Sequence, residues 1–338
     1  MKLQQLRYIW EVAHHDLNVS ATAQSLYTSQ PGISKQIRLL EDELGVEVFA
    51  RSGKHLTRVT PAGESILEKA GEILRKVETI KQVAQEFSNE RAGTLTIAAT
   101  HSLARYALPP VIRAFRERYP EVRLRMYQGG PMQIAEMAAD GGVDFAVATE
   151  GLELFGDLVA MPCFWWSPTL LVPASHPLVG RTPSLEEIAE YPLVTYMLGH
   201  GGRARLDDAF MHHGIAPDVV FTATDSEVIK TYVRLGTGVG IISEMAYDSV
   251  VDRDLVTVDV SRLFSPSVAM IGARYGTFVR AYMFDFIETF APHLTRELVE
   301  QAFLRRNRSE LVELFSELEL PRHADRLAAV GEVAGRPG

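Results

Sequence analysis

The sequence has few of the features that mark a secreted, membrane-bound or thiolate-metal protein. Its 338 residues include one cysteine, Cys163, which excludes an intramolecular disulfide framework and a thiolate metal cluster. No stretch approaches the roughly eighteen uncharged apolar residues of a membrane-spanning helix. Glu11 and Asp16 interrupt the N-terminal region where a secretion signal needs an unbroken apolar run. We therefore expect a soluble protein of the cytoplasm that makes no contact with a membrane.

Composition and charge narrow the class of protein further. Glycine (25) and proline (17) are not in excess, and an apolar content of 46% is enough for real cores, which excludes collagen-like and disordered chains. The length predicts roughly two to three domains. A formal net charge of −9 argues against a protein that coats nucleic acid with its whole surface. Residues 1–92 carry equal numbers of acidic and basic side chains, so a local basic patch is possible there.

The first 45 residues show the pattern of three helices. Apolar residues recur at helical spacing over residues 3–10, and Ser20 opens a second, short helix that ends at residue 26. After a turn, Ser29 is expected to cap a third helix, with Pro31 in its first turn and Gly45 at its end. The stripe that this third helix buries is expected at Ile33, Ile37, Leu40 and Leu44.

Residues 46–60 then read as a basic, two-stranded wing. A short helix, a turn, a capped helix and a wing form the layout of a winged helix-turn-helix, whose second helix enters the major groove. The alternative is a small helical bundle with an ordinary solvated face. Glutamine and arginine can read base edges, and lysine suits phosphate. The candidate DNA-binding residues are Thr28, Ser29, Gln30, Ser34, Lys35, Gln36, Arg38, Arg51 and Lys54.

A long helix is predicted from Pro61 to about residue 90. Its apolar positions alternate steps of four and three at Ile66, Ala70, Ile73, Val77, Ile80, Ala84 and Phe87. Such a heptad indicates a coiled-coil seam rather than a helix lying on a globular core, and its simplest partner is a second copy of the chain. We read residues 61–90 as a dimerisation helix.

From residue 93 onward, strand-like and helix-like segments alternate, which predicts an α/β effector domain over residues 93–300. We expect two lobes with a cleft between them: lobe 1 at about 93–162 and 267–300, and lobe 2 at about 163–266. The remainder, 301–338, is expected to hold a C-terminal helix, reaching to about residue 318, and a disordered tail over 328–338.

The cleft is the predicted ligand site, because open α/β sheets place ligands beyond the carboxyl ends of their strands. Thr100, His101 and Ser102 link a strand to a helix, so that hydroxyls meet free backbone N–H groups in an anion site. The alternative is that Ser102 simply caps the helix. Thr149 ends a neighbouring strand and adds a hydroxyl, and Asp225 caps a helix of lobe 2 and could accept an amine.

Other candidate chemistry is weaker. The adjacent pairs His14-His15 and His212-His213 point in different directions, so we predict no metal site. The glycine-rich run 236–240 follows a helix, which indicates a helix end and tight turn rather than a dinucleotide site. Cys163 is expected to be a buried structural thiol. No nucleophile–base pair stands out, so we expect neither catalysis nor a cofactor.

Two long runs of residues carry a family resemblance. ATAQSLYTSQPGISKQIRLLEDELGVEVFAR and TRVTPAGE resemble the LysR-type transcriptional regulators, and the similarity extends over residues 1–300. THSLARYALPPVIRAFRERYP, DFAVATE, EYPLVTY, FTATDSEVIKTYVRLGTGVGII and FAPHLTRELV are similar to the CysB-like subgroup, which regulates cysteine and sulfur-assimilation genes. The resemblance implies a homodimer or homotetramer that binds promoter DNA, acts on RNA polymerase, and responds to a small effector in the cleft. A solute-binding protein is the rival reading, and the N-terminal reading head argues against it.

The resemblance also implies an anionic, sulfur-related effector: sulfate, O-acetylserine, adenosine phosphosulfate or a sulfonate. Leu103 stands where the subgroup has glutamine, and Gly201 where it has threonine, and each lost donor costs about 1–3 kcal/mol. Either the effector is larger and partly apolar, such as a sulfonate, or His200 and the glycine backbone N–H groups replace the lost donors. The candidate effector-binding residues are Thr100, His101, Ser102, Leu103, Thr149, His200, Gly201, Gly202, Thr224 and Asp225.

Overall fold

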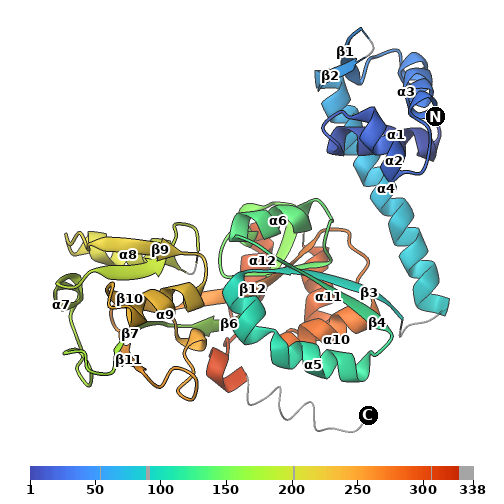
Figure 1. Ribbon diagram of the computed structural model, residues 1–338. Helices are drawn as coiled ribbons and strands as arrows, with labels where there is room; N and C mark the ends of the chain where they lie inside the picture. The colour runs from blue at the N-terminus through green and yellow to red at the C-terminus, as the bar shows by residue number, and fades with distance from the viewer. Residues whose placement is uncertain (54, 89–91, 201, 306, 327–338) are drawn as a thin grey trace. The chain divides into compact units, whose positions relative to one another are not determined.

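The computed structural model describes residues 1–53, 55–88, 92–200, 202–305 and 307–326. The chain divides into two compact units, residues 1–88 and 89–338 (Figure 1). Among the described residues, no helix is both long enough and apolar enough to cross a membrane. The expected tail over 328–338 lies outside the described residues.

The first unit is a three-helix head with a wing. Its elements are α1 (Leu3–His14), α2 (Val19–Ser25), α3 (Gln30–Leu44), β1 (Phe49–Ser52), β2 (His55–Val59) and α4 (Pro61–Ser88). β1 and β2 pair antiparallel and form the wing. Leu6, Ile9, Ile37, Leu40 and Phe49 are among the apolar side chains that these elements bury together.

Two details of the head differ from the sequence expectation. Asn18, not Ser20, caps α2, because its side chain accepts hydrogen bonds from the backbone N–H groups of Ser20 (3.1 Å) and Ala21 (3.0 Å). Leu44 is exposed and does not belong to the buried stripe of α3; Glu41 is buried on that side of the helix instead. Gly45 ends α3 in a left-handed conformation, as expected.

The long helix α4 has two different parts. Leu67 and Ala70, near its beginning, are buried in the core of the head. The prediction of a helix that does not lie on a globular core is therefore wrong for these turns. Farther along, Ile73 is 37% exposed and Ile80 is 69% exposed, so this part of the predicted seam has apolar side chains without cover in a single chain.

Lobe 1 of the second unit is a five-stranded sheet in the order β4-β3-β5-β12-β6. Its strands are β3 (Gly93–Ala99), β4 (Val122–Gln128), β5 (Phe145–Ala148), β6 (Leu158–Trp166) and β12 (Ser267–Arg274). β3 runs parallel to β4 and β5, whereas β12 runs antiparallel to β5 and β6. Helices α5 (Pro109–Arg118), α10 (Ala281–Phe290), α11 (Arg296–Leu304) and α12 (Arg308–Phe315) pack into one core with this sheet, and α6 (Pro131–Ala139) packs into another.

Lobe 2 is a second five-stranded sheet, in the order β11-β7-β10-β8-β9. Its strands are β7 (Pro168–Pro173), β8 (Leu193–Tyr196), β9 (Val219–Ala223), β10 (Val239–Ser243) and β11 (Leu255–Asp259). Helices α7 (Leu185–Ala189) and α8 (Arg203–His212) contribute to one core, and α9 (Ser226–Arg234) to the other. Gly236 follows α9 in a left-handed turn, the role expected of this glycine-rich run.

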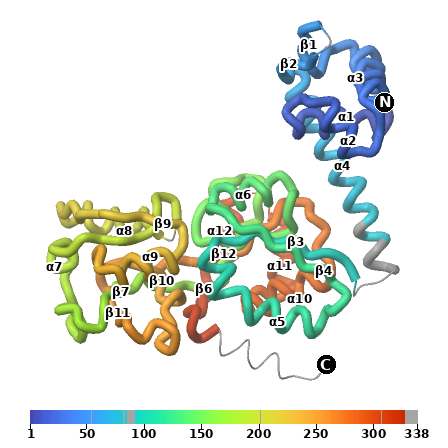
Figure 2. The backbone as a smooth tube through the Cα atoms, in the orientation of Figure 1, coloured from blue at the N-terminus to red at the C-terminus, as the bar shows by residue number. Residues whose placement is uncertain are grey.

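The chain crosses between the lobes twice, as Figure 2 lets the reader follow. The first crossing is at Ser167, between β6 and β7, and the second lies between β11 and β12. The expected crossing at residue 162/163 is wrong, because the whole of β6 pairs with β12 in lobe 1. β6 and β11 are strands that the sequence reading did not identify.

The C-terminal residues belong to lobe 1 rather than to a separate segment. α11 spans the expected boundary at residue 300, and Leu311 of α12 is buried in the lobe 1 core. Near the end of the described chain, the carbonyl of Pro321 accepts a hydrogen bond from the backbone N–H of Trp165 in β6 (3.0 Å). The fold therefore has no domain boundary at residue 301, where the sequence predicted one.

Candidate functional site

The outer face of α3 carries the predicted DNA-binding side chains. Ser29 caps the helix by accepting a hydrogen bond from the N–H of Gly32 (3.3 Å). Gln30, Lys35 and Arg38 are exposed. Thr28 and Ser29 are exposed as well, and Ser34 and Gln36 are partly exposed. This surface therefore presents amide, ammonium, guanidinium and hydroxyl groups to a partner.

The two predicted wing residues stand differently. Lys54 lies outside the described residues. Arg51 forms an ion pair with the buried carboxylate of Glu41, which also accepts hydrogen bonds from the N–H groups of Val48 (2.9 Å) and Phe49 (3.2 Å). Arg51 thus fastens the wing to α3, a structural contact that the sequence reading did not foresee.

Tyr27 is a residue of this surface that the candidate set lacks. It lies in the turn between α2 and α3, its φ is +50°, and it is 98% exposed. A bulky residue in the left-handed region is unusual and often marks a functional turn. The sequence offers one indication of this residue, because it places an aromatic side chain in the turn between two predicted helices.

The described residues contain a pocket between the two lobes of the second unit. It holds about 430 Å³ of space that no atom fills, a figure that includes open solvent. Lobe 1 contributes Thr100, His101, Ser102, Leu103, Pro131, Thr149 and Trp166, and lobe 2 contributes Tyr196, His200, Thr224, Ser243 and Met245. The structure thus brings seven of the ten candidate effector-binding residues to one pocket.

A short helix forms the lobe 1 wall of this pocket. The helix begins at His101, and its first intrahelical hydrogen bond runs from the N–H of Ala104 to the carbonyl of Thr100 (2.9 Å). Ser102 has helical dihedral angles and makes no capping hydrogen bond, which excludes the alternative that it serves as the cap. The helix continues as a π-helix over Leu103–Ala107. Such π-turns occur frequently at functional sites.

The lobe 2 wall contains two polar residues that the sequence reading missed. Tyr196 and Ser243 are the last residues of β8 and β10. The hydroxyl of Tyr196 lies 2.6 Å from Ser226 Oγ and accepts a hydrogen bond from the N–H of Ser243 (3.2 Å). Burial raises the pKa of Tyr196, while hydrogen bonds with Ser226, Ser243 and Ser102 act in the opposite direction. The phenol therefore stays neutral. The same strand-end rule that selected Thr149 could have found both residues.

Two buried polar atoms in the pocket lining have no hydrogen-bond partner among the described residues. They are Ser243 Oγ and His101 Nδ1. Ser243 is only 1% exposed. A buried polar group without a partner costs free energy, and native structures satisfy nearly all such groups. These atoms therefore point to a polar ligand or ordered water in the pocket.

Three candidate residues do not contribute as expected. Asp225 does not line the pocket; it caps α9 through the N–H of Glu227 (2.8 Å). The backbone N–H of Gly202 donates to Glu150 and is not available to a ligand. Gly201 lies outside the described residues. The prediction that the glycine backbone replaces lost donors is therefore wrong for Gly202.

The remaining polar lining includes His200, the side chain that the sequence predicts as a replacement for the lost donors. The ring of His200 lies against Gly130 of lobe 1 so closely that a Cβ added there would come within 3.0 Å of Nε2. Thr149 Oγ1 accepts a hydrogen bond from Trp166 Nε1 (3.3 Å), so its own proton remains free to donate. Leu103 is 1% exposed and supplies no donor. His200 is thus a polar side chain of lobe 2 that lines the pocket and lies against lobe 1, and its replacement of a lost donor stays a prediction.

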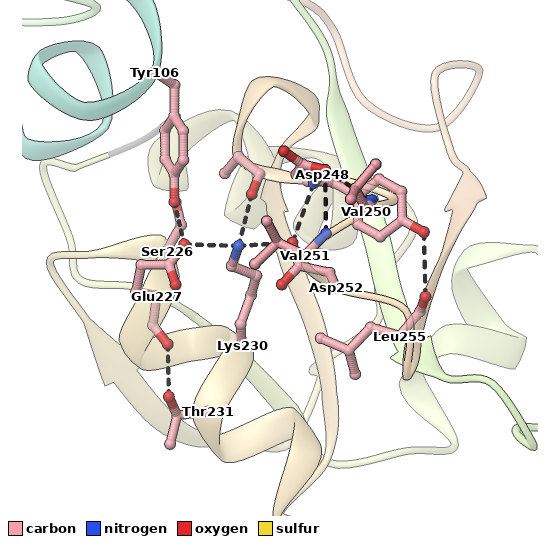
Figure 3. A network of polar contacts seen from close by, with 12 residues as sticks. Tyr106, Ser226, Glu227, Lys230, Thr231, Asp248, Val250, Val251, Asp252 and Leu255 are labelled. Atoms are coloured by element: carbon pink, nitrogen blue, oxygen red, sulfur yellow. Dashed lines mark hydrogen bonds and ion pairs between the residues drawn. The ribbon is translucent and has the colours of Figure 1, made fainter. Parts of the chain in front are cut away.

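A polar network connects the lobes beside the pocket (Figure 3). Tyr106, in the π-helix of lobe 1, donates a hydrogen bond to Glu227 of α9 (2.5 Å). Glu227 also pairs with Lys230 (2.6 Å), which is 2% exposed and pairs with the buried carboxylate of Asp252 (2.8 Å). Hydrogen bonds from Lys230 and Tyr106 hold the pKa of Glu227 below its usual value against desolvation. The network thus joins a hydroxyl of lobe 1 to a carboxylate and a buried ammonium of lobe 2.

The remaining candidates are the single cysteine and the possible metal ligands. Cys163 is fully buried in β6, and burial raises the pKa of its thiol far above the usual value. Within the described ranges, no group of three or more His, Cys, Asp or Glu residues could hold a metal ion.

A head with an exposed recognition helix, joined to a two-lobed domain with a polar pocket, defines a DNA-binding transcription regulator that responds to a small molecule. Comparison with protein families agrees. The profile described as a bacterial regulatory helix-turn-helix protein of the lysR family matches residues 3–64, and that of the LysR substrate binding domain matches residues 88–295. The chain belongs to the LysR family of transcriptional regulators.

Individual similar proteins indicate the subgroup within this family. The chain is 50% identical over 321 residues to the HTH-type transcriptional regulator CysB of Haemophilus influenzae, covering 95% of this chain and 99% of that protein. It is 48% identical over 295 residues to the regulator SsuR of Burkholderia cenocepacia, covering 87% and 96%. The crystal structure of the cofactor-binding domain of the Cbl transcriptional regulator matches 64% of this chain and 96% of that chain, with 43% identity and a TM-score of 0.62.

Proposed function

We propose that this regulator controls genes of sulfur assimilation or cysteine biosynthesis in response to a small sulfur-containing anion bound between its two lobes. The observation that carries the proposal is the pair of partnerless buried atoms, Ser243 Oγ and His101 Nδ1, in a pocket lined from both lobes. Similarity to CysB across nearly the whole chain supports the sulfur-related class.

The lining of the pocket suits a small anion held without a fixed cation. Its described lining includes no lysine or arginine. Hydroxyls of Thr100, Thr149 and Ser243, together with the first backbone N–H groups of the helix at His101, supply hydrogen bonds instead. Donors fixed at a helix N-terminus stabilise negative charge. Sulfate is the simplest compound of this class.

A sulfonate is the second candidate effector. Leu103, Pro131, Trp166 and Met245 give the pocket an apolar part that a bare sulfate would leave unused. A sulfonate places the same three oxygens beside a hydrocarbon group. Adenosine phosphosulfate and O-acetylserine carry further polar groups that would need partners beyond this lining.

At the promoter, α3 enters the major groove and the wing approaches the flanking backbone. The exposed apolar residues Ile73 and Ile80 on α4 support pairing with a second copy of the chain, which would place two heads on successive half-sites. Pairs of such dimers would form the tetramer. Ligand binding then changes the closure of the lobes, and with it the spacing of the DNA-binding heads and the contacts that the regulator offers to RNA polymerase in the cytoplasm. A ligand shifts this equilibrium only by its different affinities for the two arrangements.

Thermal unfolding of the full chain with a panel of ligands tests the proposal. The panel contains sulfate, thiosulfate, O-acetylserine, adenosine phosphosulfate and an alkyl sulfonate, with chloride at equal ionic strength as the control. At a hundred times its dissociation constant, a bound ligand stabilises the folded state by about 2.7 kcal/mol, which raises the midpoint of the second unit by roughly 5–11 °C. Ser243→Ala should reduce that shift. A flat response to the whole panel would remove the sulfur assignment but not the DNA-binding one.

A further inference from the structure

The last described residues, 321–326, connect the two walls of the pocket. We call this segment the C-terminal strap. In Figure 1 the end of the described chain lies beside β6, where the first crossing between the lobes begins. Besides the hydrogen bond between Trp165 and Pro321, Arg322 forms an isolated parallel bridge with Trp165 there, and residues 323–326 are helical. The guanidinium of Arg322 lies over the Trp165 ring, 5.5 Å from its centre.

Arg326 anchors the strap to the wall of the pocket in lobe 1. It is only 1% exposed, and its guanidinium lies 4.6 Å from the centre of the Phe164 ring and 4.9 Å from that of Phe290. It donates hydrogen bonds to the carbonyls of Phe290 (3.0 Å) and Ala107 (2.8 Å). Ala107 is the last residue of the π-helix. Arg326 therefore holds the end of the helix whose beginning lines the pocket.

Arg322 anchors the strap to the opposite wall. Its guanidinium pairs with the carboxylate of Glu244, with Nε donating to Oε1 (3.1 Å) and Nη2 donating to Oε2. Glu244 stands between Ser243 and Met245, both of which line the pocket. The same carboxylate accepts a hydrogen bond from the N–H of Ser167 (3.2 Å), the residue at which the chain crosses between the lobes.

We propose that Arg322 and Arg326 are positioning residues of the effector pocket, which the C-terminal strap braces from behind on both lobes. Neither side chain lines the pocket. Arg326 fixes the position of the π-helix through the carbonyl of Ala107. Arg322 fixes the position of Glu244 and thereby that of the neighbouring residue, Ser243. The Ser243 hydroxyl has no hydrogen-bond partner among the described residues. A bidentate arginine–carboxylate pair defines geometry as well as charge, so the strap orders the lobe 2 wall relative to the crossing. Effector affinity then depends on residues that the ligand never touches. The inference rests on the proposed function of the pocket.

The test compares two truncated chains and three single substitutions in otherwise intact protein. A chain ending at Arg326 keeps the strap, and a chain ending at residue 320 lacks it. Arg322→Ala removes the ion pair with Glu244 and the contact with the Trp165 ring, and it leaves the buried Arg326 in place. Arg296→Ala is the matched control, because Arg296 also pairs with a carboxylate in lobe 1, that of Glu300 at 2.9 Å, but on α11. Arg322→Lys keeps the charge and loses the bidentate geometry.

Two readouts separate this inference from the proposed function. The first is calorimetric titration with whichever panel compound stabilises the intact chain. We expect Arg322→Ala to bind it roughly three- to thirtyfold more weakly, Arg322→Lys to fall between, and both the chain ending at Arg326 and Arg296→Ala to bind as the intact chain does. The second is amide hydrogen exchange without ligand. Exchange should accelerate in the π-helix and at residues 243–246 in the chain ending at residue 320, relative to the chain ending at Arg326.

Each result decides a different question. Unchanged affinity in Arg322→Ala, with unchanged exchange in the shorter chain, would overturn the bracing role even if the pocket binds its effector. If the intact chain binds no compound of the panel, the effector class is wrong, and the exchange comparison still decides whether the strap orders the pocket walls.

Discussion

The DNA-binding face and the effector pocket are built in opposite ways. On α3, the polar side chains follow one another in a single stretch of sequence, and Gln30, Lys35 and Arg38 stand exposed. In the pocket, polar groups come from strand ends and helix starts in both lobes, and Ser243 and Tyr196 are almost fully buried. Substitutions on α3 should therefore change binding alone, whereas changes around the pocket should alter binding and folding together.

The largest effect is expected where charge is buried beside the pocket. Lys230→Ala removes the lysine partner of both Asp252 and Glu227; because Asp252 keeps its ion pair with Arg234 (2.7 Å), the loss should approach, but not exceed, the about 3–5 kcal/mol of a buried charge left alone. Urea unfolding should show this loss in the second unit. Lys81→Ala, which removes an exposed ion pair with Glu78 on α4, should change stability by less than about 0.5 kcal/mol. Equal losses in the two variants would contradict the contrast between the regions.

On the DNA-binding face, Gln30→Ala and Lys35→Ala should weaken binding in different ways. Loss of a base contact by Gln30 should lower discrimination between DNA sequences by about 1–3 kcal/mol. Loss of a phosphate contact by Lys35 should weaken binding to all sequences and reduce the slope of log affinity against log salt by about one. Fluorescence anisotropy over a salt series measures both. Unchanged sequence preference in Gln30→Ala would count against α3 as the recognition helix.

A pH experiment sharpens the comparison inside the second unit. Burial, and then the charge of Arg326, lower the pKa of His323 from 6.5 to about 4. The unfolded chain therefore binds a proton below pH 6.5 that the folded chain refuses, so stability falls as the pH decreases from 6.5 towards 4. At pH 5.5 the loss from this group is about 1.4 kcal/mol.

His323→Gln, which cannot titrate, should lose that much less stability than the intact chain between pH 7 and pH 5.5 in urea unfolding. Identical losses in both proteins would show that His323 takes up its proton in the folded state.

The smallest effect is expected for the hydrogen bond between the lobes. Tyr106→Phe removes the donor to Glu227, but Glu227 keeps its pairing with Lys230, so no buried charge is left alone. The loss of stability should be about 0.5–1.5 kcal/mol. Because Tyr106 and Glu227 lie in different lobes, effector affinity should fall by a similar free energy in calorimetry. A loss of stability without any change in affinity would separate this network from the pocket.

The sequence predicts the head well because its signals are local. A cap at Ser29, a proline in the first turn and a glycine at residue 45 are enough to define α3. The sequence does not reveal which basic side chain already forms an ion pair within the protein. Arg51 and Glu41 are ten residues apart, and only the folding of the wing against α3 brings them together.

The pocket could be predicted in part. Thr100, His101, Ser102 and Thr149 follow from the rule that ligands bind where strands end, Leu103 follows from the family resemblance, and all five line the pocket. Tyr196 and Ser243 obey the same rule but stand in apolar strands, where a tyrosine and a serine look like ordinary core and turn residues. Nothing in the sequence near Arg322 and Arg326 indicates their partners, because Glu244 and Ala107 lie 78 and 219 residues away.

Control of the DNA-binding head by occupancy of the pocket is tested most directly by a DNA titration. A DNA duplex is first selected from a random pool by the intact chain. The intact chain and Ser243→Ala are then each titrated with this duplex, with and without the compound that stabilises the intact chain. We expect saturating ligand to change the DNA affinity of the intact chain at least about fivefold. Ser243→Ala should bind DNA equally well without ligand and need more ligand for the same change. An identical ligand response in both proteins, or no response in the intact chain at saturation, would contradict control of the head by the pocket.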